Sequence, residues 1–139
     1  MEMKEFTREL ETSKIYTIYA EDIEYENEDF IIGFIAAIDG SDIVIACVDK
    51  EGENNGFLLL DIGDIYRVDF DSSYEKKIET LYHDKKQYHE KFGFSTGEDP
   101  LREYFIEWAY DNNKTVTVSF FETDSSVCGS IEKTDQRIY

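Results

Sequence analysis

Three apolar runs of strand length, cut by turn residues, constrain the fold of this chain more than any other feature. β-branched and aromatic residues dominate the runs, as is typical of strands. The dipeptides Asp39-Gly40 and Asn55-Gly56 indicate tight turns between them. The runs cover residues 30–38, 43–48 and 57–68. This arrangement predicts an antiparallel meander.

Single glycines inside these runs indicate where the strands bend. Gly33 lies in the middle of the first run and Gly63 inside the third, and a glycine in a strand usually marks a bend or the close approach of another backbone. Ahead of the runs, residues 15–25 show the pattern of a first strand, and residues 49–56 suit a polar hairpin loop. Because a small barrel needs such bends, the sequence predicts a strongly bent sheet that closes into a barrel.

A long helix is predicted after the sheet, over residues 73–91. Ser72 and Glu75 have the spacing of a capping box, and apolar residues recur at helical spacing behind them. A large share of the basic residues falls on this helix, among them Lys76, Lys77, Lys85 and Lys86. Two interpretations stay open: a solvent-exposed face balanced by neighbouring acidic residues, or a patch that faces a partner.

A second helix and further strands are predicted in the last third of the chain. Asp99 suits the N-cap and Pro100 the first helical position. Strand signals follow over residues 115–121 and 127–131. The segment that begins at Gly129 aligns with the one that begins at Gly33, which indicates two copies of one unit. The apolar stripe of the helix consists of Leu101, Tyr104, Phe105 and Trp108.

The chain is strongly acidic, with 32 acidic residues against 14 basic ones and a formal net charge of −18. Such a surface repels phosphate at long range, which disfavours RNA as a partner. Solubility, attraction of a basic protein and mimicry of a polyanion all remain open as interpretations. No apolar run reaches the roughly 20 residues of a membrane helix, and residues 1–14 lack the apolar region of a signal peptide. We therefore expect a cytoplasmic protein with no membrane contact.

The spacing of Gly33, Ile35 and Asp39 resembles the first signature of the Sm-like family, which includes Hfq-type proteins. A helix, strands and a second glycine segment at residues 129–135 are similar to the start of a further copy. The resemblance implies a short N-terminal helix followed by five strongly bent strands in a small barrel. It also implies RNA binding and ring assembly through the edge strands of neighbouring barrels.

Departures from the family pattern bear on function. Asp61 and Asp64 stand where the family carries a basic residue, and Asp42 lies in the loop that follows Asp39. Because phosphate contacts depend on Lys or Arg, the RNA-binding pore of the family is not expected here. The second copy ends at Tyr139, near its third strand. Either the chain is a truncated product, or another element or chain completes that copy.

No catalytic or cofactor motif is present in the sequence. His83 and His89 are both placed in the predicted helix, but six residues apart and on different faces, so they do not form a metal pair. Cys47 and Cys128 fall in apolar runs and are expected to be reduced core residues. We therefore expect no enzymatic activity and no cofactor.

Two weaker binding hypotheses remain. A divalent cation is one ligand for the pair Asp39 and Asp42, or for the pair Asp61 and Asp64. Nucleic-acid bases are the other, because an exposed aromatic platform can stack them. The tyrosines considered for that platform are Tyr16, Tyr19, Tyr25 and Tyr66.

The predicted fold class is mainly β with helices (α+β): a small, strongly bent antiparallel Sm-like or SH3-like barrel, a connector helix and a second, incomplete Sm-like unit. The expected boundaries are residues 1–70 for the barrel, 71–98 for the connector and 99–139 for the partial unit. The main hypothesis is a non-enzymatic module that binds a protein partner or itself. The alternatives are a divergent RNA-binding regulator and an acidic nucleic-acid mimic that inhibits a basic nucleic-acid-binding protein. The predicted interaction residues are Asp39, Asp42, Asp61, Asp64, Lys76, Lys77, Lys85 and Lys86, and the predicted structural residues are Gly33, Gly63, Gly129 and Trp108.

Overall fold

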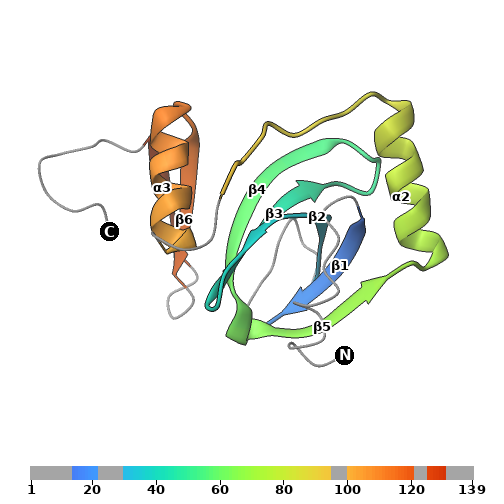
Figure 1. The fold of residues 1–139 in the computed structure, drawn as a ribbon, viewed down its shortest axis with the longest axis horizontal. Helices are drawn as coiled ribbons and strands as arrows, with labels where there is room; N and C mark the ends of the chain where they lie inside the picture. The colour runs from blue at the N-terminus through green and yellow to red at the C-terminus, as the bar shows by residue number, and fades with distance from the viewer. Residues whose placement is uncertain (1–13, 22–29, 95–99, 121–124, 131–139) are drawn as a thin grey trace, which may run out of the picture. The chain divides into compact units, whose positions relative to one another are not determined.

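The computed structural model describes residues 14–21, 30–94, 100–120 and 125–130, and it shows an α+β protein (Figure 1). The predicted class, mainly β with helices, is confirmed at this level. The chain forms two compact units, residues 1–93 and 94–139. Within the described residues, no helix is long and apolar enough to cross a membrane. The N-terminal helix that the resemblance implies and the segment 131–139 lie outside the described residues.

The first unit is built on a five-stranded sheet in which all neighbouring strands are antiparallel. The strand order is β4-β3-β2-β1-β5, so β4 and β5 form the two edges. A 3-10 turn, η1, connects these two edge strands, and a helix, α2, follows β5 (Figure 1). The elements are β1 (Ile15–Ala20), β2 (Phe30–Ile38), β3 (Asp42–Val48), β4 (Asn54–Asp61), η1 (Ile62–Asp64), β5 (Ile65–Phe70) and α2 (Ser73–Asp84).

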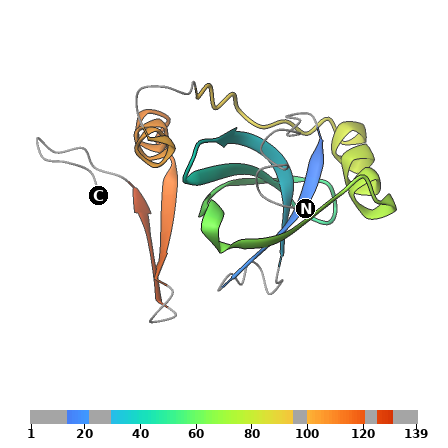
Figure 2. The same cartoon turned by 60° about the horizontal axis from the view of Figure 1, so that its bottom comes forward.

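The sheet curls around one hydrophobic cluster to which all five strands contribute, as the curved ribbons of Figures 1 and 2 show. Gly33 allows β2 to approach β3 closely at this curve. A Cβ atom added there would lie 2.7 Å from Cγ2 of Ile45 and 2.9 Å from the carbonyl carbon of Ala46, and closer still to the carbonyl oxygen. The predicted close approach of another backbone at Gly33 is therefore confirmed. The members of the cluster are Tyr16, Ile18, Ala20, Ile31, Ile35, Ile43, Ile45, Cys47, Leu60 and Ile65.

One of the two predicted tight turns is confirmed and the other is wrong. Asp39 closes the β2–β3 turn, because its Oδ1 accepts hydrogen bonds from the backbone N–H groups of Ser41 (2.8 Å) and Asp42 (2.7 Å). Asn55 and Gly56 instead lie inside β4, where Gly56 has a φ of 84° and the pairing with β3 shifts register. An Asn-Gly pair supplies the positive φ of a bulge as readily as that of a turn. The chain reverses earlier, at residues 49–53.

The 3-10 turn divides the third apolar run, which was predicted as a single strand with a bend. The backbone N–H of Gly63 donates to Oδ1 of Asp61 at 2.7 Å, and this bond caps η1. The first strand ends at Ala20 rather than at residue 25, and Glu21 stands in a turn. Residues 22–29 lie outside the described residues.

Helix α2 begins where the capping box predicts but ends seven residues early. Ser72 donates its backbone N–H to Oε1 of Glu75 at 3.0 Å, which confirms the start at Ser73. The helix ends at Asp84, and Lys86 has a φ of 54°, so the prediction of a helix to residue 91 is wrong. The apolar residues beyond Asp84 follow helical spacing by coincidence. Phe92 is buried against Phe57 of β4 from an extended segment.

A buried carboxylate fixes α2 to the sheet. The side chain of Glu75 is buried, and its Oε2 accepts a hydrogen bond from the hydroxyl of Thr17 on β1 at 2.9 Å. The hydroxyl of Ser72 donates to the other oxygen at 2.6 Å. These donors replace the water that the carboxylate loses. Ile78 and Tyr82 on the same helix face pack in a second cluster with Ile15 of β1.

The second unit contains a helix and a strand pair. Its elements are α3 (Leu101–Asp111), β6 (Thr115–Phe120) and β7 (Ser125–Ser130), and β6 and β7 pair antiparallel, with Gly129 opposite Val116. Pro100 precedes the helix, where it was predicted as its first residue, and Asp99 lies outside the described residues. Leu101 is buried, and Trp108 is half-buried with Nζ of Lys114 lying 5.8 Å from its ring centroid.

Candidate interaction surfaces

The four predicted acidic residues meet at one end of the first sheet. Asp42 and Asp61 are paired across β3 and β4, beside the β2–β3 turn that holds Asp39, and Asp64 ends η1. The carboxylates of Asp39 and Asp61 accept backbone N–H groups in their own turns, and Asp42 is buried. Among the described residues, no three metal-ligating side chains form a group that could hold a metal ion. The contacts at this corner are those of turn formation.

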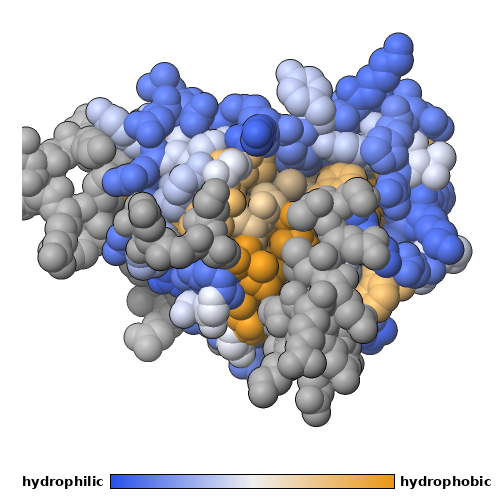
Figure 3. Space-filling model, in the orientation of Figure 1, coloured by the Kyte–Doolittle hydropathy of each residue, from blue (hydrophilic) through white to orange (hydrophobic). Residues whose placement is uncertain are grey.

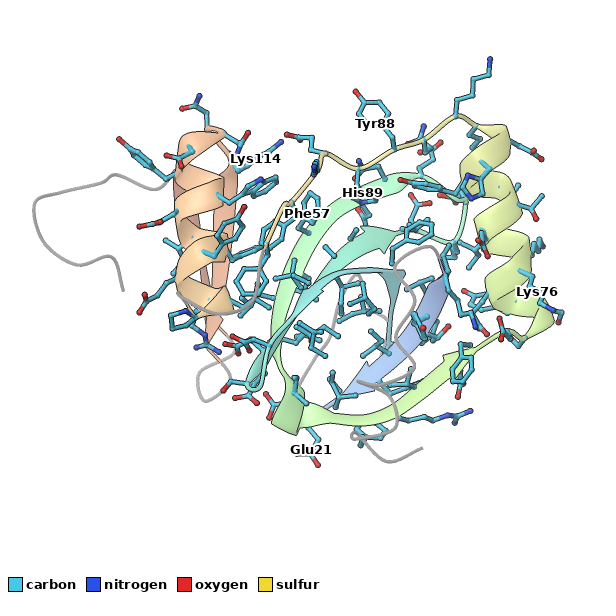
Figure 4. All side chains as sticks on the ribbon, viewed as in Figure 1. Glu21, Phe57, Lys76, Tyr88, His89 and Lys114 are labelled. Atoms are coloured by element: carbon cyan, nitrogen blue, oxygen red, sulfur yellow. The ribbon has the colours of Figure 1, made fainter. Side chains whose placement is uncertain are left out.

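The four predicted lysines do not form one patch on a helix. Lys76 and Lys77 are exposed in the first half of α2, whereas Lys85 and Lys86 follow its last residue. Nζ of Lys85 lies 3.5 Å from Oε1 of Glu53 in the β3–β4 hairpin. α2 shows a mainly hydrophilic outer face in the space-filling view, and Lys76 points away from the sheet (Figures 3 and 4). These positions favour the solvent-exposed interpretation of the basic residues.

The segment after α2, residues 85–93, runs along the outer edge of β4, and we call it the strap. The backbone N–H of Asn54 donates to the side-chain oxygen of Gln87 at 3.0 Å. The side-chain amide of Asn54 donates to the carbonyl oxygen of Tyr88 at 2.6 Å. Side chains of the strap also line a shallow pocket of about 310 Å³ together with Asn54. The strap therefore occupies hydrogen-bonding positions that a neighbouring strand would need at this end of β4.

His89 holds the middle of the strap to the sheet. Its Nε2 lies 3.2 Å from the carbonyl oxygen of Gly56, and its Nδ1 lies 2.9 Å from the hydroxyl of Tyr82. A carbonyl only accepts, so Nε2 carries the proton and Nδ1 accepts from the tyrosine. Burial lowers the pKa of His89 below its ordinary value of 6.5, and burial also raises the pKa of Tyr82. Figure 4 shows His89 turned towards the sheet near Phe57, and Tyr88 turned away from it.

The prediction that His89 lies in the helix is wrong, because α2 ends before it.

Four aromatic side chains and one arginine form a second candidate surface, which we call the aromatic–arginine surface. Ring centroids lie 5.7 Å apart for Tyr19 and Phe30, 6.2 Å for Tyr19 and Tyr66, and 6.5 Å for Phe30 and Tyr74. The surface consists of Tyr19, Phe30, Tyr66, Arg67 and Tyr74, from β1, β2, β5 and α2.

Arg67 lies over the ring of Tyr19 on this surface. Its guanidinium carbon is 4.8 Å from the ring centroid of Tyr19. Nε and Nη2 donate to the two carboxylate oxygens of Asp69 at 3.0 and 2.9 Å, a bidentate pair. The hydrogen bond to Asp69 and the charge of that carboxylate raise the pKa of Arg67. The arginine therefore remains charged while it stacks on the ring.

The predicted tyrosine platform is only partly assembled. Tyr19 and Tyr66 come together, but Tyr16 is 2% exposed and packs in the core against Phe70, and Tyr25 lies outside the described residues. Arg67 is not apparent from the sequence as a site residue, because its neighbour Tyr19 is 48 positions away and only the β1–β5 register, which pairs Tyr19 with Arg67, brings them together. The signal that the sequence offers for this surface is Tyr66, an aromatic residue in the last strand of the meander.

Comparison of the chain with protein-family models, with curated proteins and with solved structures found no match. The proposal for function therefore rests on the geometry of the edge strands β4 and β5 and of the aromatic–arginine surface.

Proposed function

We propose that the chain is a non-enzymatic interaction module that binds another protein through the aromatic–arginine surface. Tyr66 is 61% exposed and Tyr74 is 40% exposed, which is unusual for rings of this size on an otherwise polar surface. Tyrosine is enriched in the residues that contribute most to protein–protein binding. The observation that carries the proposal is this group of rings, in which Tyr66 and Tyr74 are exposed and which β1, β2, β5 and α2 bring together.

We further propose that the first unit is an Sm-like barrel. Five bent antiparallel strands that surround one core agree with the architecture that the resemblance implies. β2 approaches β3 closely at Gly33, the glycine that carries the resemblance, and the chain bends at Gly63, the second glycine of the meander. The helix and strand pair of residues 94–139 suit the start of a second Sm-like unit.

RNA is the second candidate partner, because Tyr19, Tyr66 and Arg67 also combine ring faces with a guanidinium, as base-stacking surfaces do. The net charge of the chain favours a protein partner over RNA. A net charge of −18 repels a polyanion and attracts a basic protein.

A pull-down at low salt with matched tyrosine variants tests the proposal. Tyr66→Ala removes an exposed ring from the surface, whereas Tyr88→Ala removes a 75% exposed ring from the strap. We expect proteins captured by the wild type to be retained by Tyr88→Ala and lost with Tyr66→Ala. Light scattering on the same samples reports self-association. Equal capture by all three forms would refute this surface as the binding site, and nuclease-sensitive capture would favour RNA.

A further inference from the structure

We propose that the aromatic–arginine surface recognises an arginine side chain from a basic segment of the partner, and that Arg67 occupies that position in the free protein. This inference rests on the proposed function and names the chemistry of the partner. It follows from the groups that surround Arg67, which together form a binding site for a guanidinium.

Two different groups define the site. The ring of Tyr19 supplies a face at 4.8 Å from the guanidinium carbon, and Asp69 supplies two carboxylate oxygens at 3.0 and 2.9 Å. A planar cation that stacks on a ring and fits a carboxylate by two parallel hydrogen bonds is the mode in which proteins bind arginine. Tyr66 extends the ring face beside Tyr19, so the site continues onto the surface.

Arg67 can leave this position at low cost. Its side chain is 60% exposed, and exposed ion pairs contribute little to folding stability. Asp69 lies on the same strand as Arg67. The ring contacts of Phe30 with Tyr19 and with Tyr74 do not involve Arg67. An incoming arginine therefore exchanges with Arg67 and does not require the sheet to rearrange.

The charge of the chain favours a basic occupant. The net charge of −18 attracts a cationic segment over a distance of roughly 10 Å at moderate salt. The bidentate geometry then distinguishes arginine from lysine, because an ammonium group cannot form two parallel hydrogen bonds with one carboxylate. Attraction by net charge alone makes no such distinction, and this difference permits a test.

The test measures the binding of two fluorescent peptides to the full chain by anisotropy. One peptide alternates glycine with arginine, and the other alternates glycine with lysine. Arg67→Ala vacates the site and removes one positive charge. Lys91→Ala removes the same charge from the exposed side of the strap and serves as its matched control. Tyr66→Ala shortens the ring face without a change in charge.

We expect Arg67→Ala to bind the arginine peptide more tightly than Lys91→Ala does, by about fivefold, a ratio typical of a cation–π contact. The lysine peptide should show no such difference, and Tyr66→Ala should weaken the arginine peptide. Equal binding of the arginine peptide by Arg67→Ala and Lys91→Ala would overturn the inference. If Tyr66→Ala still weakens both peptides in that case, the proposed protein-binding surface survives without its arginine site. If Tyr66→Ala weakens neither peptide, the surface itself is refuted.

Discussion

Replacement of Gly33 by alanine should destabilise the first unit severely. The added Cβ would lie 2.7 Å from Ile45 Cγ2 and 2.9 Å from the carbonyl carbon of Ala46, and Cβ contacts in proteins essentially never fall under 3.0 Å. Because the carbonyl group of Ala46 belongs to the backbone of β3, relief requires the two strands to separate by roughly 0.7 Å or more at the centre of the sheet. Overpacking of this kind typically costs about 1–3 kcal/mol, and we expect about 3 kcal/mol here because backbone must move.

Urea unfolding followed by far-UV circular dichroism measures this loss. For a unit of this size, about 3 kcal/mol corresponds to a fall in Tm of roughly 12–24 °C. Fluorescence of the single tryptophan is the wrong probe, because Trp108 belongs to the second unit. Gly40→Ala is the matched control, since nothing lies within 4 Å of an added Cβ there. If Gly33→Ala unfolds within about 0.5 kcal/mol of Gly40→Ala, the close approach of β2 and β3 is refuted.

Three further outcomes are expected from contacts in the first unit. Because burial lowers the pKa of His89, the stability that its neutral ring supports is complete above pH 6.5 and is lost as the pH falls towards the lowered value. The free energy of unfolding should therefore decrease as the pH falls below the ordinary pKa of 6.5, and His89→Gln should show a smaller decrease. Thr17→Val removes a donor from the buried carboxylate of Glu75 and should cost about 1–3 kcal/mol in urea unfolding; an unchanged midpoint would contradict the buried bond. Phe92→Ala should cost about 3–5 kcal/mol and Tyr88→Ala under about 0.5 kcal/mol by the same measurement, and equal values would mean that the strap does not pack on the sheet.

Local signals in the sequence predict the elements of the first unit well. Ser72 and Glu75 place the start of α2 correctly, because both partners of a capping box lie within one turn. Asp39 places the β2–β3 turn for the same reason. Periodicity fails beyond Asp84, where Tyr88 and Phe92 continue the helical spacing. The positive φ of Lys86 and the burial of Phe92 against β4 override that spacing, and neither can be read from neighbours in sequence.

The candidate surface depends on register, which the sequence leaves open. Tyr66 is recognisable as an aromatic residue in a strand, but its exposure follows from the irregular pairing after Tyr19, where the β1–β5 register shifts. From the sequence alone, a lysine of α2 is as reasonable a partner for Asp69 as Arg67 is. Only the pairing of β1 with β5 places Tyr19 beneath Arg67. Contacts between strands 48 positions apart are set by the whole core, and single-sequence patterns do not contain them.

The free-energy cost of adding a strand from another chain differs between β4 and β5, the two edges of the first sheet. At β4 a new strand must displace the strap, which means loss of the hydrogen bonds to Asn54 and Gly56 and exposure of Phe92, a residue only 5% exposed. Exposure of that ring alone costs about 1.5–3 kcal/mol. Among the described residues, β5 has no strand on its outer side, and the aromatic–arginine surface adjoins it. A partner segment that pairs with β5 would therefore gain backbone hydrogen bonds and side-chain contacts in one step. This asymmetry favours the β5 edge as the place where a partner binds, and we expect a change at His89, which secures the strap, to affect binding there only through stability.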